Sequence, residues 1–179
     1  MIKKLLIILF ISILTGCNSS INSPTSTVES FFYKYQINEE EIMMQLDNSL
    51  KDEKFLNDKL KTNYKTIMKR QYQDLRYNIT DEQINGKHAI VTIELEVYDY
   101  KNAMNEADDY LIINKQDFSD DLGNINYEKF MNYKTEKMKN IKDRIKYMIE
   151  LHLTKVNEKW KIDNIDESIR QKIHGIYNE

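Results

Sequence analysis

Residues 84–98 read INGKHAIVTIELEVY, and this stretch decides the fold. Asn85-Gly86 is the strongest signal for a two-residue hairpin turn, because both residues tolerate a positive φ angle. After the turn, aliphatic residues occupy every second position, at Ala89, Val91, Ile93, Leu95 and Val97. A period of two predicts a long strand of an antiparallel sheet, with one apolar face buried and one polar face hydrated.

Three more strands are expected to join this one. The segment before the turn predicts a weaker strand, with apolar residues at Tyr77, Ile79 and Ile84. Residues 147–154 alternate between apolar and polar side chains in the same way. A tight turn at Asn157-Glu158 then leads to a short last strand around Trp160. This is the only tryptophan, and we expect it to be buried in the core.

Helices are predicted before the hairpin. Ser23-Pro24 predicts a helix start, because Ser caps free amides and Pro tolerates only the first turn. A second helix is expected over residues 39–50 with Asn38 as its cap, and a third over residues 53–75. The helical periodicity of these segments predicts one apolar face on each.

Further helices are predicted after the hairpin. Residues 101–145 predict two helices separated by a turn at residues 120–124. The second of them is expected to carry its apolar face on Tyr127, Met131, Met138, Ile141 and Ile145. A closing helix is expected to begin near Asn164, which forms a capping-box pattern with Glu167.

The order of these segments resembles small bacterial lipoproteins of the nuclear transport factor 2-like, or cystatin-like, fold. The opening helix with Phe31-Phe32, the hairpin and the strand at residues 159–163 carry this resemblance. Uncharacterised lipoproteins of low-GC Gram-positive bacteria are similar at residues 97–100, 142–144, 153–156 and 172–177. The resemblance implies an α+β fold, a curved antiparallel sheet wrapped by helices around a conical cavity. Here a helical insertion would precede the last two strands, and no catalytic residue set carries over from the family.

The first residues predict export and lipidation. Lys3 and Lys4 precede the apolar run of residues 5–14, which is shorter than the about 20 residues that a membrane-spanning helix needs. The run ends in Leu14-Thr15-Gly16-Cys17, a bacterial lipobox. We therefore expect signal peptidase cleavage between Gly16 and Cys17, and lipidation of Cys17. An ordinary signal peptide with a chance cysteine is the alternative.

Three segments follow from this assignment: a lipoprotein signal peptide (1–16), a lipidated tether (17–23) and a single α+β domain (24–179). Removal of Lys3 and Lys4 leaves 24 basic against 29 acidic residues, a net charge of −5. Such a balance argues against a nucleic-acid partner, which needs clustered Lys and Arg. Since Cys17 is the only cysteine, disulfides, thiol catalysis and zinc–thiolate sites are not expected in the domain.

Polar residues on the strands are the candidates for chemistry. His88, Glu94 and Glu96 share one strand face, and Glu150 with His152 share another. Together they could bind a divalent metal or perform acid–base chemistry. However, they lie opposite the apolar stripe, so we expect them to face solvent or a partner.

Other polar groups have structural interpretations. His174 is expected at the end of the last helix, where a cation is favoured and Gly175 ends the helix. Glu39, Glu40 and Glu41 fit a helix N-terminus. Residues 117–123 offer only a weak surface calcium contact, because the loop lacks a closing glutamate.

The predicted function is that of a membrane-anchored lipoprotein on the extracytoplasmic face of the cell membrane. We expect a non-enzymatic accessory domain that binds an envelope protein or a small ligand, with no catalytic residues, metal or cofactor. A cavity-based hydrolase or isomerase is one alternative, and an inhibitor or immunity lipoprotein is the other.

Overall fold

A computed structural model of the protein describes residues 22–51 and 56–178. The signal segment, Gly16 and Cys17 therefore lie outside the described residues, and the expectations on them stay predictions. In chain order the elements are α1 (Pro24–Gln36), α2 (Glu40–Lys51), α3 (Asp58–Gln73), β1 (Arg76–Asn85), β2 (His88–Tyr98), α4 (Tyr100–Ile113), the 3-10 helix η1 (Lys115–Phe118), α5 (Tyr127–Asn140), β3 (Arg144–Val156), β4 (Lys159–Ile162) and α6 (Glu167–His174).

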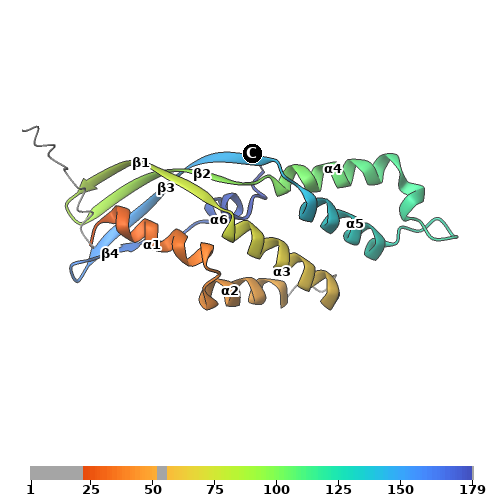
Figure 1. Ribbon diagram of the computed structural model, residues 1–179, viewed down its shortest axis with the longest axis horizontal. Coiled ribbons are helices and arrows are strands. Elements are labelled where there is room, and N and C mark those ends of the chain that lie inside the picture. The colour runs from red at the N-terminus through yellow and green to blue at the C-terminus, as the bar shows by residue number, and fades with distance from the viewer. Residues whose placement is uncertain (1–21, 52–55, 179) are drawn as a thin grey trace, which may run out of the picture.

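The strands form one antiparallel sheet in the order β1-β2-β3-β4. Helix α1 contacts β1, β2 and β4, and α6 contacts β2. Figure 1 shows the strands arching over these helices, with α2 and α3 further from the sheet. The expected α+β class is confirmed. So is the helical insertion, because α4, η1 and α5 separate β2 from β3.

Strand β2 supplies the centre of the core, as its alternation predicts. Its inward residues Val91, Ile93, Leu95 and Val97 are all fully buried. Ile93 lies opposite Ile79 of β1 and Ile149 of β3, so three strands meet in one apolar row. The polar residues between them lie on the other face of the sheet.

A bulge in β1 explains the odd spacing of its apolar residues. The register shifts between Ile79 and Asp81. Ile79 consequently pairs with Ile93 and Ile84 with Ala89, although an odd interval separates them. One extra residue in a bulge reverses the alternation, so both isoleucines lie opposite buried residues of β2, although Ile84, near the end of β1, is itself 55% exposed.

The first hairpin turn differs from the prediction by one residue. Asn85 is the last residue of β1 and pairs with His88, so Gly86 and Lys87 form the turn. Gly86 takes the positive φ of 61° that the turn requires. At the second turn Asn157 and Glu158 have φ angles of 49° and 61°, as expected for a two-residue hairpin loop.

Two early helix starts are corrected by the structure. Asn38 does not cap α2; its φ is 52°, and the backbone turns sharply there between α1 and α2. The third helix begins at Asp58, since the side chain of Asn57 accepts a hydrogen bond from the amide of Leu60. Glu53, the expected start, lies outside the described residues. The start of α1 is confirmed, with a capping box between Ser23 and Ser26.

The later helices are shorter than predicted. Helix α5 ends at Asn140, and Ile145 belongs to β3, where it pairs with Val97. Helix α6 begins at Glu167 because the carboxylate of Asp166, not Asn164, accepts from the amide of Ile169.

The main core lies between the sheet and the helices on its inner face. Phe32 of α1 stacks on Tyr77 of β1 with ring centroids 4.6 Å apart. Trp160 is only 9% exposed, which confirms its expected burial. No helix among the described residues is long and apolar enough to cross a membrane.

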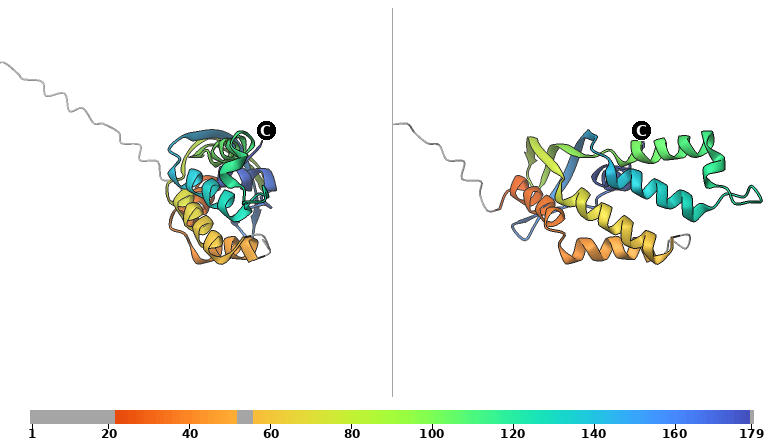
Figure 2. Two further views of the ribbon diagram at one scale, coloured as in Figure 1. Left: turned by 90° about the vertical axis from the view of Figure 1, so that its right-hand side faces the viewer. Right: turned by 45° about the vertical axis from the view of Figure 1, so that its right-hand side comes forward.

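The insertion forms a projecting arm, which we define as residues 100–140. Figure 2 shows α4 and α5 side by side and extending away from the sheet. The arm has a small core of its own, built on Ala107, Phe118 and Phe130. An ion pair between Lys134 and Asp108, at 2.7 Å, also joins the two helices.

The base of the arm is fixed to the main body by polar contacts. The side-chain amide of Gln71, a fully buried residue, accepts from the backbone N–H of Tyr98 and donates to its carbonyl. The carbonyl of Gly175 accepts from the amide of Lys101 at 2.8 Å. Helices α3, α4 and α6 therefore meet at the end of β2.

Candidate functional site

A groove between α2 and α6 is the strongest candidate site. A cavity of about 460 Å³ opens there. Its lining comes from α1, α2, α3, α6 and the residues just after α6: Tyr35, Ile42, Gln45, Leu46, Ser49, Tyr72, Glu167, Arg170, His174 and Ile176. Five of these residues are aromatic or aliphatic and five are polar or charged, so the lining offers both apolar contact and hydrogen-bonding groups.

His174 and Tyr72 form a hydrogen-bonded pair in this lining. The Tyr72 hydroxyl lies 3.0 Å from Nε2 of His174. Burial lowers the pKa of His174 to about 4, so the imidazole is neutral at physiological pH. Burial also raises the pKa of Tyr72 well above its ordinary value. Both groups are therefore neutral at physiological pH, and the tautomer of the imidazole decides whether the hydroxyl donates to Nε2 or accepts from it.

Neighbouring rings fix this pair. Tyr35 of α1 contacts Tyr72 edge to face, with ring centroids 5.1 Å apart. Burial raises the pKa of Tyr35 as well, although the nearby Arg170 opposes this shift. Helices α1, α3 and α6 thus hold two phenols and an imidazole in a mostly buried setting.

Charged groups lie at the edge of the groove. Arg170 and Glu167 form a loose ion pair of 3.7 Å, and both side chains are more than half exposed. Glu167 raises the pKa of His174 and Arg170 lowers it, but both effects are smaller than that of burial. The two charges are therefore available to a bound molecule.

A second hollow extends the groove along α6 towards the loop after β4. Its volume is about 300 Å³, and it shares Tyr35, Ile42, Gln45 and Arg170 with the first. Two adjoining hollows with shared walls can accommodate an elongated ligand. We refer to both together as the Tyr72–His174 groove.

The protonation states favour binding over proton transfer. A general acid or base is most effective when its pKa lies near the working pH. Burial lowers the pKa of His174 to about 4 and raises the pKa of Tyr72. Both groups therefore act at neutral pH as fixed hydrogen-bonding groups.

The expected place of His174 at the end of α6, before the stop at Gly175, is confirmed. The expected cation is not, because burial beside Tyr72 of α3 lowers the pKa of His174 to about 4 and keeps the ring neutral. Tyr72 was missed altogether. The signal for it was its spacing of four residues from the buried Met68, which continues the inner face of α3.

The polar strand residues lie on the outer face of the sheet, as predicted. They do not converge, because Glu150 lies opposite Thr92, and Glu94 lies opposite Met148. Glu94 instead pairs with Lys146 at 2.8 Å, and Glu96 with Arg144 at 2.8 Å. His88 and His152 share this face, and among the described residues no three His, Cys, Asp or Glu side chains are grouped to hold a metal ion.

The two acidic segments also have local partners. Glu39 forms an ion pair with Lys34 at 3.1 Å. The Asp120 carboxylate accepts from the amides of Leu122 and Asn124. These backbone hydrogen bonds, that from Asn124 first, lower the pKa of Asp120 and give its carboxylate a structural role in the loop.

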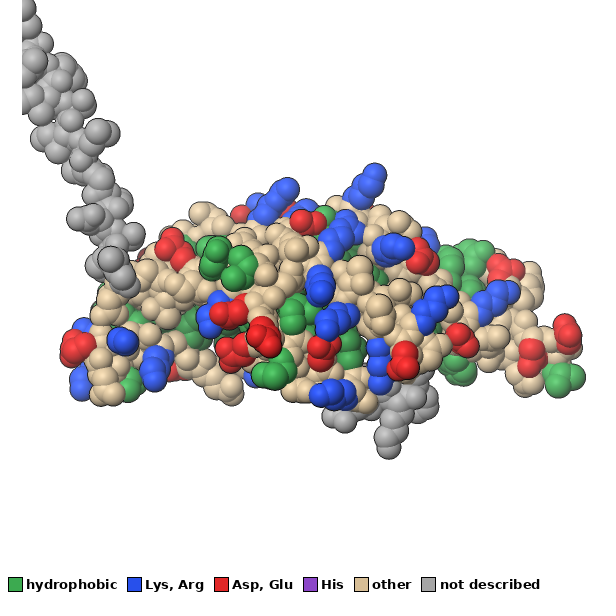
Figure 3. Space-filling model, turned by 60° about the horizontal axis from the view of Figure 1, so that its bottom comes forward, with side chains coloured by type: hydrophobic (Ala, Val, Ile, Leu, Met, Phe, Trp, Pro, Cys, Tyr) green, Lys and Arg blue, Asp and Glu red, His purple; other side chains and the backbone are tan. Residues whose placement is uncertain are grey.

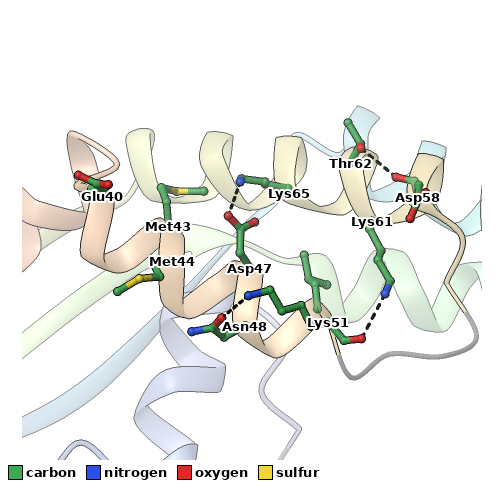
Figure 4. A pocket seen from close by; sticks show the side chains of 11 residues that line it. Glu40, Met43, Met44, Asp47, Asn48, Lys51, Asp58, Lys61, Thr62 and Lys65 are labelled. Atoms are coloured by element: carbon green, nitrogen blue, oxygen red, sulfur yellow. Dashed lines mark hydrogen bonds and ion pairs between the residues drawn. The ribbon is translucent and has the colours of Figure 1, made fainter.

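A larger hollow lies between α2 and α3, with a volume of about 670 Å³. Figure 4 shows that its lysines already have partners within the lining. Lys65 contacts Asp47 at 2.6 Å, and Lys51 donates to Asn48 at 2.9 Å. The lysines of this hollow are therefore already matched by groups of its own lining.

No protein-family profile matches the chain, and no curated protein matches its sequence. Among solved structures, it is similar to the crystal structure of YcdA from Bacillus subtilis, itself inferred to be a lipoprotein. The identity is 14%, the TM-score is 0.45, and the match covers 87% of this chain. The match covers 47% of YcdA, so the chain spans about half the length of that protein. The proposals that follow rest on this chain's own residues.

Proposed function

We propose that the protein is a lipid-anchored binding protein of the bacterial cell envelope that holds a small ligand in the Tyr72–His174 groove. The observation that carries this proposal is the neutral His174, hydrogen-bonded to Tyr72, in the wall of a groove with Arg170 and Glu167 at its edge. Fixed hydrogen-bonding groups beside apolar side chains can orient a ligand without transforming it.

The groove suits a small amphipathic molecule. Tyr35, Ile42 and Ile176 offer aromatic and aliphatic contact to an apolar body. Gln45 and Ser49 of the lining can exchange hydrogen bonds with uncharged polar groups. The enzyme alternative is less well supported, because the pKa of His174 lies far from neutrality.

The anchoring part of the proposal rests on the sequence. The lipobox Leu14-Thr15-Gly16-Cys17 follows a basic start and an apolar core, the pattern of an exported lipoprotein. Diacylglycerol on Cys17 would attach the tether to the extracytoplasmic face of the cell membrane. Two acyl chains, at about 0.8 kcal/mol per buried methylene, anchor a protein stably where one does not.

A cystatin-like fold is the finer fold assignment that we propose. Its support is that α1 precedes a four-stranded antiparallel meander and packs across three of its strands. The arm between β2 and β3 would be an insertion in that fold.

Titration with small probes tests the groove. We expect phenol, indole and benzamide to shift the methyl NMR signals of Ile42 and Ile176 saturably in the wild type. Ser49→Trp should fill the groove and weaken this binding at least about tenfold. Ser30→Trp is the matched control, since Ser30 is also an exposed helical serine bonded to its own helix, but lies outside the groove. Equal shifts in both variants would contradict a groove site.

Palmitate labelling tests the anchor. Cys17→Ser should abolish incorporation of the label and leave the chain uncleaved after Gly16. Labelling that persists in Cys17→Ser would show that the lipid assignment is wrong, without affecting the groove.

A further inference from the structure

The end of the arm exposes large apolar side chains. We define the arm tip as residues 109–129. Four of its side chains are more than 70% exposed: Ile112 (77%), Ile113 (79%), Leu122 (86%) and Tyr127 (73%). Isolated exposed apolar residues are common, but four at the end of one projection form an unusual concentration.

The arm holds these side chains on a firm support. Phe118 packs edge to face on Phe130 with ring centroids 5.5 Å apart. Ser119 and Ile125 form an antiparallel bridge that closes the loop. At the base, the guanidinium of Arg70 donates to the carbonyls of Lys139 and Ile141. The tip is therefore presented by an ordered element.

The net charge of the arm tip limits which kind of partner can bind there. The arm tip contains five acidic residues and two lysines, a net charge of −3. The acids are Asp109, Asp117, Asp120, Asp121 and Glu128, and all are exposed. Figure 3 shows acidic and apolar side chains together at the far end of the molecule.

Three possible binding partners of the acidic, apolar arm tip can be compared. A bacterial membrane surface rich in anionic lipid would repel an acidic tip. Two tips of this chain would repel each other for the same reason. A protein with an apolar patch bordered by Lys and Arg would be attracted, and would cover the isoleucines and Leu122.

The position of the arm agrees with a protein partner. The described chain begins at Asn22, whose side chain donates to the carbonyl of Glu158 at the β3–β4 turn. Figure 1 shows this turn at one end of the long axis and the arm at the other. With the proposed lipid anchor on the preceding residues, the tip would point away from the anchored end. This orientation and the envelope location of the partner rest on the proposed lipid anchor, and neither rests on the groove.

We infer that the arm tip is a docking surface for a second envelope protein that presents a basic-rimmed apolar patch. Apolar contacts supply the buried centre of such an interface, and the acids steer the encounter and set its specificity.

Site-specific photocrosslinking in intact cells of the producing bacterium tests this inference. A benzoylphenylalanine probe replaces Ile113 or Leu122 in the full chain, or Met148 as a control on the outer sheet face, which is 54% exposed. We expect both tip probes to yield the same protein adduct, and the Met148 probe not to yield it. Thermal melting of each variant should match the wild type, because all three sites are exposed.

Charge reversal supplies the decisive comparison. Asp109→Lys with Asp121→Lys should reduce the tip adduct at least about tenfold. Glu29→Lys with Glu150→Lys changes the net charge equally, at exposed sites outside the arm, and should leave the adduct intact. Adducts with lipid, adducts with a second copy of this chain, equal loss in both double variants, or no adduct would each overturn the inference. Failure of the groove titration would not bear on it.

Discussion

Gly175 lies where any larger side chain would collide with the end of β2. Its φ is +69°, and a Cβ atom there would lie 2.1 Å from the Tyr98 carbonyl oxygen and 2.4 Å from Nε2 of Gln71. Both neighbours belong to the junction that joins α3, α6 and the arm. We expect Gly175→Ala to lower the free energy of unfolding by more than about 2 kcal/mol, measured by urea denaturation.

Gly86→Ala is the matched control for this prediction. Gly86 has a similar φ of +61°, but no atom lies within 4 Å of the added Cβ. Only the conformational cost should remain there, about 1 kcal/mol. Equal losses in the two variants would show that the close contact at Gly175 is unimportant.

The lowered pKa of His174 should make the free energy of unfolding depend on pH in a specific way. Its pKa falls from 6.5 to about 4 on folding, so below pH 6.5 the unfolded chain binds more protons than the folded one. Stability is therefore lost as the pH falls from about 6.5 towards 4, by up to about 3 kcal/mol. We expect urea denaturation to show a steeper loss in the wild type than in His174→Gln, which does not titrate. Parallel curves for the two proteins would contradict a buried neutral imidazole.

At the scale of elements, β4 is short and its stability depends on one side chain. Trp160 is 9% exposed, and the residues on either side of it point to solvent. Truncating a buried tryptophan typically costs about 3–5 kcal/mol. We expect Trp160→Ala to lower the melting temperature strongly and Lys161→Ala to change it little. A Trp160→Ala melting temperature equal to that of the wild type would show that β4 contributes little to the core.

The strands were more predictable than the helix ends for physical reasons. The alternation of β2 is a local pattern, and it can be read without knowledge of the partners. Ile145 fits the helical spacing of α5 equally well, and only its pairing with Val97 assigns it to β3. Asn164 and Asp166 are both good caps, and tertiary context selects Asp166.

The candidate site was harder to predict than the fold. Tyr72 and His174 lie 102 residues apart in the chain, and their hydrogen bond exists only after α6 has packed on α3. A lone histidine near a helix end carries no sign of this partner. The outer-face residues, in contrast, were placed correctly because strand alternation alone determines their side of the sheet.

At the scale of the whole molecule, two separate cores predict two levels of stability. Phe32 is fully buried in the core beneath the sheet, whereas Phe118 is 4% exposed in the core of the arm. Regions with few shared contacts open independently of the rest. The outer part of the arm should therefore unfold locally at a lower free energy than the sheet, whereas its base shares the main core through Tyr100, Ala103 and Met138.

A matched pair of truncations tests this division. Phe32→Ala should lower the free energy of global unfolding by about 3–5 kcal/mol, because it empties the main core. Phe118→Ala should move the global transition by less than about 1 kcal/mol, yet make amide hydrogens in the outer parts of α4 and α5 exchange at least about a hundredfold faster. The amides of β2 and β3 should keep their protection in Phe118→Ala, since their pairing does not involve the arm core. If both variants lowered the same transition equally, the two cores would form one cooperative unit, and the arm would not be an independent element.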